Sequence, residues 1–255
     1  MCPVVRLEEV AEGCPETIRL YLEDAYLREV EAEVIRYVPE TKKSGYLVLD
    51  ATIFHPRGGG QPSDTGEVVA SDGSRFRVRK VLEAGPVVVH YGQVVQGDPP
   101  TGRVRLLLDW EPRYQVMRYH TAGHVLDHAV LSVVGGDLSS ASAFHGPPEG
   151  YIEFEGELGA VDPRALEIEA NRVVGEDRRV YAIWVGKEEL PGRVKGAFNL
   201  WRLPDLPRYR VVVIEGINAI PCGGTHVSRT GEVGKVRVTG IDVSGGLSRV
   251  RYRVE

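Results

Sequence analysis

Two histidines and, far along the chain, a cysteine with another histidine have the spacing of metal ligands. His120 and His124 are four residues apart in a segment with helical periodicity, so both imidazoles project from one face, one turn apart. Cys222 and His226 flank the pair Gly223-Gly224, where a turn would let the sulfur and the imidazole converge. Thiolate and imidazole both suit Zn²⁺. The two pairs together predict one shared zinc site, although each alone would be read as solvated helix histidines or as a buried thiol beside a surface histidine.

The number of ligands leaves the role of such a metal open. Four protein ligands close a tetrahedral zinc site and indicate a structural ion, whereas a catalytic zinc keeps a position for water. Either His226, at the end of the flexible turn, is bound loosely, or the metal expands its coordination. No Asp or Glu stands beside the ligands as an obvious general base.

A run of glycines and a run of serines are the other segments that could contact a ligand. Gly58–Gly66 opens with three glycines, which expose N–H groups and allow close approach, but it lacks the Lys and Ser/Thr of a phosphate-binding loop. On physical grounds alone, a permissive turn between strands is the favoured reading. Residues 139–142 supply hydroxyls and are expected to form a solvated loop. His128 is expected to be structural, and His55, His90 and His145 have no partner at a useful spacing.

The first part of the chain reads as short strands that would make a β-barrel or a sandwich. Strands are predicted at 46–54, 67–69, 76–81, 87–91 and 104–108, separated by Gly and Pro signals. The second part reads as α+β, with two helices against a mainly antiparallel sheet. We place the boundary between residues 110 and 111.

The helix predicted over 113–134 must position the histidine pair. Its apolar stripe runs through Ala122, Leu126, Ala129, Val130 and Val133 and ends at a pair of glycines. The histidines lie on roughly the opposite face, so they look at water or into a cleft. A second helix should open at Asp162-Pro163 and run to about residue 176. A short helix is predicted at 188–195, and strands at 151–154, 180–185, 210–215, 233–237 and 249–254.

Composition excludes several classes of protein. The chain has 255 residues, a net charge of −5 and three cysteines. These values argue against a disulfide framework and a strongly basic nucleic-acid binder. No apolar run approaches the ~18 residues of a membrane span. Glu8 and Glu9 interrupt the region where an export signal would be apolar, so we expect a cytoplasmic protein with no membrane partner.

Three stretches resemble the signatures of one known family. His120–His124, Cys222–Val227 and Gly58–Gly66 are similar to the motifs of alanyl-tRNA editing proteins, the editing domain of alanyl-tRNA synthetase and its free-standing AlaX relatives. Order and spacing agree over roughly residues 45–240. The length is similar to the medium-sized, free-standing AlaX class.

The resemblance implies a fold. It is an N-terminal β-barrel like those of translation factors (residues 1–110, with the glycine motif), followed by a zinc-binding α+β editing domain (residues 111–255) of the kind shared with threonyl-tRNA synthetase.

The resemblance also implies an activity: hydrolysis, in trans, of tRNA(Ala) mischarged with serine and possibly glycine. It makes His120, His124, Cys222 and His226 the Zn²⁺ ligands. It also places Gly59, Gly60 and Gln61 beside the pocket, and Ser140 among the residues that could sense the serine hydroxyl. Gly123 departs from the family, which often has a larger residue there.

A synthetase pocket for alanine accepts glycine and excludes serine poorly, so a second, hydrolytic site is needed. We expect the zinc to align the ester while neighbouring groups hold the water. The alternatives are a non-catalytic, zinc-stabilised RNA-binding module and the editing of another tRNA. The sequence does not give the oligomeric state.

Two sets of alternating arginines are candidates for contact with the tRNA backbone. Arg75, Arg77 and Arg79 alternate along one predicted strand, and Arg249, Arg251 and Arg253 along another, so each set lies on one sheet face. A solvated strand face explains each set equally well.

Overall fold

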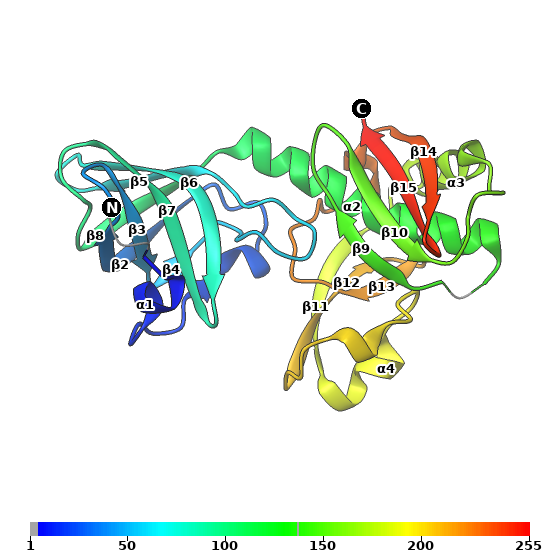
Figure 1. Cartoon of the computed structure of the whole chain (residues 1–255), viewed down its shortest axis with the longest axis horizontal. Helices are drawn as coiled ribbons and strands as arrows, with labels where there is room; N and C mark the ends of the chain where they lie inside the picture. The colour runs from blue at the N-terminus through cyan, green and yellow to red at the C-terminus, as the bar shows by residue number, and fades with distance from the viewer. Residues whose placement is uncertain (1–4, 137) are drawn as a thin grey trace. The chain divides into compact units, whose positions relative to one another are not determined.

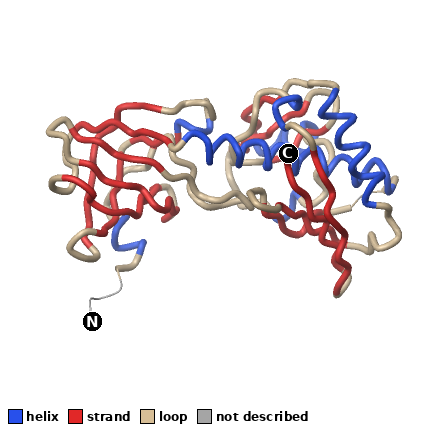
Figure 2. Tube along the Cα trace, turned by 90° about the horizontal axis from the view of Figure 1, so that it is seen from above, coloured by secondary structure: helices blue, strands red, loops and turns tan. Residues whose placement is uncertain are grey.

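The computed structural model describes residues 5–136 and 138–255, which form two compact units. The first unit comprises the chain up to Gly58 together with Pro62–Arg113, and the second comprises Gly59–Gln61 and Tyr114–Glu255 (Figure 1). Each unit is described by itself. Figure 2 shows that strands make up most of the first unit, whereas longer helices join the strands in the second. Within the described residues, no helix combines the length and the apolar character needed to cross a membrane.

The first unit is a closed β-barrel with the strand order β2-β3-β7-β6-β5-β8. A short parallel pair, β1 with β4, lies outside this order. The elements are α1 (Leu7–Ala11), β1 (Ile18–Arg19), the 3₁₀ turn η1 (Leu20–Leu22), β2 (Glu29–Pro39), β3 (Ser44–Leu49), β4 (Ala51–Thr52), β5 (Gly66–Ala70), β6 (Arg75–Ala84), β7 (Val87–Gln96) and β8 (Arg103–Leu108).

The barrel core is formed by side chains that alternate between the inside and the outside of the barrel. Along β5 and β8, every second residue is buried, as expected when one face of a strand points inward. Phe54, Phe76 and Leu106 are fully buried in this core. The barrel expectation is therefore confirmed over a sandwich.

Two strand predictions in the barrel need correction. The strand expected at 46–54 is two strands, β3 and β4, because the chain breaks at Asp50, whose carboxylate accepts a hydrogen bond from the Glu33 N–H (2.7 Å). Strand β2 was not predicted. The exposed side chains of its first half are glutamates, and two of them pair with arginines of β8: Glu29 with Arg105 (3.1 Å) and Glu31 with Arg103.

A buried ion pair anchors the segment that follows the glycines. The Arg113 side chain is fully buried and Asp64 nearly so, and Arg113 Nε lies 2.9 Å from Asp64 Oδ1. The same guanidinium donates to the carbonyls of Ala25 (3.0 Å) and Ile53 (2.6 Å). All its donors that face the interior therefore have partners, which is the condition for burying a charged group at tolerable cost.

The second unit combines helices with two antiparallel sheets, ordered β14-β15-β10-β9 and β11-β12-β13, where a single sheet was expected. Its elements are α2 (Trp110–Val134, whose first turn belongs to the first unit), β9 (Ser140–Phe144), β10 (Gly150–Glu155), α3 (Pro163–Gly175), β11 (Val180–Gly186), η2 (Lys187–Glu189), α4 (Leu190–Arg193), η3 (Leu200–Arg202), β12 (Arg208–Ile214), β13 (Asn218–Pro221), η4 (Thr230–Val233), β14 (Val236–Ser244) and β15 (Leu247–Val254).

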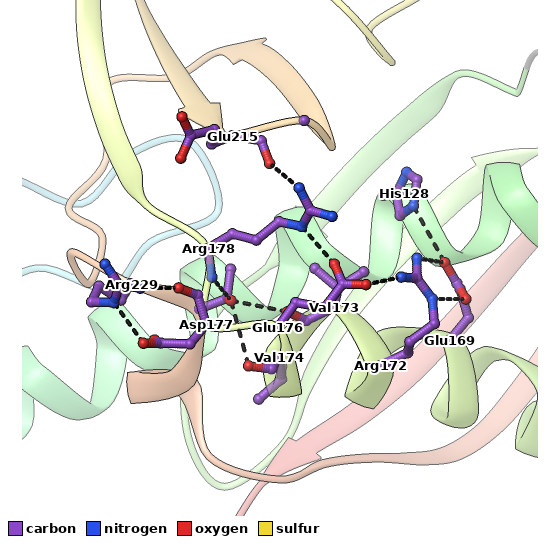
Figure 3. Close-up of polar contacts among 12 residues, drawn as sticks. His128, Glu169, Arg172, Val173, Val174, Glu176, Asp177, Arg178, Glu215 and Arg229 are labelled. Carbon is purple, nitrogen blue, oxygen red and sulfur yellow. Dashed lines mark hydrogen bonds and ion pairs between the residues drawn. The ribbon is translucent and has the colours of Figure 1, made fainter.

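Helix α3 begins and ends as its sequence predicts. The Asp162 carboxylate accepts the Arg164 N–H (2.9 Å), and proline occupies the first turn. Figure 3 shows the ion pairs near its end, where Glu169 receives both Arg172 and His128 (3.4 Å). His128 is thus tied to α3, in agreement with its predicted structural role.

Some local expectations for this unit were wrong. Of residues 139–142, expected in a loop, the last three belong to β9, since pairing with β10 outweighs the weak strand propensity of serine and alanine. Strand β13 was not predicted, and residues 230–233 form a 3₁₀ turn, so the expected strand begins only at Val236. Helix α2 is buried on the histidine face, which agrees with the expected cleft and not with water, whereas Val133 in its apolar stripe is exposed.

Candidate metal centre and cavity

The structure brings the four predicted ligands together. Helix α2 carries His120 and His124, and the loop after β13 carries Cys222 and His226. One ligand atom from each lies within 4.8 Å of all the others. Cys222 Sγ is 3.5 Å from His120 Nε2 and 3.4 Å from His226 Nε2. Such a cluster of imidazoles and a thiol could bind a metal ion.

Gln61, from the glycine segment, orients His120. Its Oε1 accepts a hydrogen bond from the Thr225 N–H (2.9 Å) and also lies 2.8 Å from His120 Nδ1. Because this oxygen only accepts, Nδ1 carries the proton and Nε2 presents its lone pair toward Cys222. A partner of this kind on the second ring nitrogen is what fixes the tautomer of a metal-binding histidine.

The other two histidines are also held for coordination. His226 Nδ1 lies 3.1 Å from the hydroxyl of Thr121, the residue after His120. Asn218 donates to the backbone carbonyl of His124 (2.8 Å). The Nδ1 atom of His124 is buried and has no hydrogen-bond partner within the described residues. An orphaned buried nitrogen in this cluster fits a metal ligand.

The electrostatics favour neutral imidazoles. Burial, followed by the charge of Arg210, lowers the pKa of His124 to about 4. Burial raises the pKa of the Cys222 thiol, while the Gly224 N–H and Arg210 act in the opposite direction. Arg210 also donates to the carbonyls of Cys222 and Gly224, both at 2.9 Å, and so braces the loop.

Three of the four candidate ligands, His120, His124 and Cys222, line a cavity of about 220 Å³. Of the other predicted site residues, Gly59 and Ser140 line it as well. Gly60 does not, but a Cβ there would lie 2.6 Å from the Ala143 carbonyl, and its φ is +77°. The complete lining is Gly59, His120, Gly123, His124, Asp127, Ser140, Ala143, His145, Ile152, Ile220, Pro221, Cys222 and Gly223.

His145 belongs to this site, although the sequence showed no partner for it. Its ring stacks on that of His120, with centroids 4.4 Å apart and planes 16° apart, and its Nδ1 lies 2.8 Å from the Tyr252 hydroxyl. A Cβ at Gly123 would lie 2.4 Å from His145 Cε1. The departure noted at Gly123 is therefore the space that His145 fills. An unusual glycine inside a helix was the one signal in the sequence for this contact.

Asp127 corrects the expectation that no acidic residue accompanies the ligands. It follows His124 by three residues on α2, lines the same cavity and is 9% exposed. Burial raises the pKa of its carboxyl to about 7. The i,i+3 spacing, which places two residues on neighbouring parts of one helix face, was the signal in the sequence.

The proposed arginine sets are mostly engaged in ion pairs. Arg75 contacts Glu67 (3.0 Å), Arg77 contacts Asp109 (3.0 Å) and Arg251 contacts Asp242 (2.7 Å), whereas Arg79 is exposed. These ion pairs do not show whether the arginines bind RNA, so RNA binding stays a prediction for both sets.

Comparison with known proteins finds two family models that match parts of the chain. Residues 26–111 match the family model "tRNA synthetases class II (A)", and residues 209–251 match "Threonyl and Alanyl tRNA synthetase second additional domain". The second match contains both candidate ligands of the loop after β13. These matches agree with the resemblance to alanyl-tRNA editing proteins.

The curated relatives that match the chain are much longer proteins. Alanine–tRNA ligases of Ignicoccus hospitalis and Pyrococcus abyssi are each 36% identical over 96% of the chain, which covers 26% of either relative. The alanine–tRNA ligase of Methanoculleus marisnigri is 37% identical over 98% of the chain and 27% of its own length. The chain thus spans about a quarter of these curated relatives.

Proposed function

We propose that the chain is a deacylase that hydrolyses the ester bond of tRNA(Ala) mischarged with serine or glycine, at a site that holds Zn²⁺. The observation that carries this proposal is the cluster of His120, His124, Cys222 and His226, of which the first three line a cavity of about 220 Å³. A cavity of this size suits an aminoacyl ester and excludes folded RNA. The substrate places the reaction with translation, in the cytoplasm, and the barrel would resemble those of translation factors.

The chain's own residues position the reaction. A zinc ion bound here would supply a Lewis acid that polarises the ester or lowers the pKa of a water. Gln61 and Thr121 hold two imidazoles so that their Nε2 atoms face Cys222. Gly59 and Ser140, at the cavity wall, would contact the aminoacyl group. Because an aminoacyl ester is already activated, alignment of the ester and a held water supply most of what its hydrolysis needs.

His226 is held as firmly as the other proposed ligands. This bears on how a bound zinc ion would keep a position open for water. Its ring is buried, contacts Thr121 and lies 3.4 Å from Cys222 Sγ. These contacts favour an expanded coordination over release of His226.

An exposed face of β11 and β12 is the best-placed surface for the single-stranded end of the tRNA. The guanidinium of Arg208 lies 4.6 Å from the ring centroid of Trp184, which is 42% exposed. Two residues along β12, Arg210 donates to the carbonyl of the ligand Cys222. Exposed aromatic rings and arginines bind single-stranded nucleic acid by stacking and charge. This face therefore leads a nucleic-acid strand toward the ligand loop.

The proposal is tested by deacylation of Ser-tRNA(Ala), Gly-tRNA(Ala) and correctly charged Ala-tRNA(Ala). We expect hydrolysis of the first two and sparing of the third. Cys222→Ala and His124→Ala should abolish hydrolysis and lower the zinc content, with folding followed by circular dichroism. His128→Ala is the matched control, since this histidine lies on the same helix and pairs with Glu169.

Other outcomes would favour other functions. Folded, zinc-loaded protein that hydrolyses none of the three would favour the non-catalytic RNA-binding module, which a closed set of four ligands also fits. Hydrolysis of Ser-tRNA(Thr) in place of tRNA(Ala) substrates would assign the chain to threonyl-type editing.

A further inference from the structure

We propose that Asp127 binds the α-ammonium group of the aminoacyl ester and restricts the enzyme to substrates with a free amine. This inference rests on the proposed deacylase function and deepens it. It predicts that N-acylated and peptidyl-tRNA, in which the amine is blocked, are poor substrates.

The position of Asp127 supports this role. The residue lies about one turn beyond His124 on α2, lines the cavity that holds the ligand cluster and is more than nine-tenths buried. Within the described part of the chain, its carboxyl makes no hydrogen bond and no ion pair. A buried acidic group is ordinarily paired, so an unpaired one in a cavity marks a place for a ligand.

The charge balance of the cavity indicates a cation as that ligand. The described residues that line the cavity with Asp127 include three histidines but no lysine or arginine. The guanidinium of Arg210 donates to the carbonyls of Cys222 and Gly224. The four-ligand cluster already supplies a full donor set for a metal without Asp127. The aminoacyl group brings the missing positive charge itself, as its ammonium.

The alternatives lead to different substrate dependences. If Asp127 read the serine hydroxyl, its loss would affect the seryl substrate and leave the glycyl substrate unchanged. If it only maintained the cavity, its loss would affect every substrate equally. Binding of the ammonium predicts a third pattern, in which seryl and glycyl substrates suffer alike and an N-acetylated substrate does not.

The experiment compares wild type, Asp127→Asn and the control Asp98→Asn, which removes an exposed carboxylate from the turn after β7. Each is assayed for kcat/KM on Ser-tRNA(Ala), Gly-tRNA(Ala) and N-acetyl-Ser-tRNA(Ala). Loss of a buried charge pair should lower kcat/KM of Asp127→Asn on both free-amine substrates by at least about 30-fold. The N-acetyl substrate should be poor for wild type and change less than about threefold in the variant, since a factor of three is under 1 kcal/mol. Asp98→Asn should match wild type throughout.

A binding measurement separates substrate recognition from effects on the metal. The probe is an adenosine with a 3′-seryl amide, which cannot be hydrolysed, with and without an N-acetyl group. Calorimetry on metal-stripped wild type and Asp127→Asn should show that the variant loses affinity only for the free-amine probe. Equal affinities of the two proteins for that probe would overturn the inference.

Failure of this inference differs from failure of the proposed function. If wild type hydrolyses none of the aminoacyl-tRNAs, the deacylase proposal fails, while the binding arm still tests Asp127. If wild type is active but Asp127→Asn reduces all three substrates equally, or the seryl substrate alone, then Asp127 does not bind the ammonium.

Discussion

At the scale of single residues, the site depends on the space that a glycine of α2 leaves for the histidine that follows β9. Gly123 lacks a side chain, and the His145 ring occupies that space, stacks on His120 and contacts Tyr252. His120, a proposed metal ligand, is therefore supported on one side by Gln61 and on another by a second imidazole. Stacking of this kind restricts the ring to one orientation, which a metal ligand requires.

Gly123→Ala should therefore destabilise the protein, although alanine is the better helix former. The added Cβ would lie 2.4 Å from His145 Cε1, and overpacking of this kind costs about 1–3 kcal/mol. Urea denaturation measures the effect. The double variant Gly123→Ala/His145→Ala should recover part of the loss, and a single variant as stable as wild type would contradict the packing described.

His90, in the barrel, should make stability depend on pH. Burial lowers its pKa from 6.5 to about 4, while its Nδ1 donates to the Leu47 carbonyl (3.1 Å). The unfolded state then binds the proton more tightly, so stability is complete above about pH 6.5 and is lost as pH falls toward 4.

His90→Gln should remove this dependence. Between pH 6.5 and 4, the free energy of unfolding of wild type should fall by roughly 3 kcal/mol more than that of the variant. The other buried histidines are common to both proteins, so the difference isolates His90. Parallel curves for the two proteins would show that His90 does not titrate in this way.

At the scale of elements, the sequence predicted those whose signals are local. Helix α3 followed from Asp162-Pro163, and most strands of the barrel followed from short runs between Gly and Pro signals. Strands β2 and β9 did not, because glutamates and small residues form strands there only through partners supplied by β8 and β10. The four proposed ligands could be predicted from their spacing in the sequence. The presence of His145 and Asp127 at the site follows only from how other segments pack around α2.

The segment that follows the glycines depends on the pair formed by Asp64 and Arg113. Asp64→Asn leaves the guanidinium buried without its counter-charge, which should cost about 3–5 kcal/mol. Thermal denaturation would show a lower midpoint, while Asp72→Asn, at an exposed turn, should change little. A midpoint within a degree or two of wild type for Asp64→Asn would mean that water reaches Arg113.

At the scale of the whole molecule, net charge gives little guidance to RNA binding. The chain carries a charge of −5, and many of its arginines are neutralised by neighbouring carboxylates. Contact with phosphates must then come from local groups, which makes the salt dependence of binding the useful measurement.

This measurement distinguishes two candidate surfaces for tRNA, the face of β11 and β12 and the arginines of β6. We expect Arg208→Glu and Trp184→Ala to weaken binding of tRNA(Ala), the first with a smaller salt slope and the second with an unchanged slope, because one removes charge and the other a stacking ring. Arg79→Glu represents the barrel set at an exposed position. If only Arg79→Glu weakened binding, the tRNA would contact β6 and not the face of β11 and β12.

Residues 59–61 belong to the second unit although they lie within the sequence of the first. A fragment starting at Tyr114 would keep every proposed metal ligand but would lose Gln61, the partner of His120, and Gly60, whose carbonyl accepts the His145 N–H (2.8 Å). No single cut of the polypeptide separates barrel and editor into intact halves. Truncated variants that keep the histidine cluster with its supporting contacts must therefore retain residues 59–61.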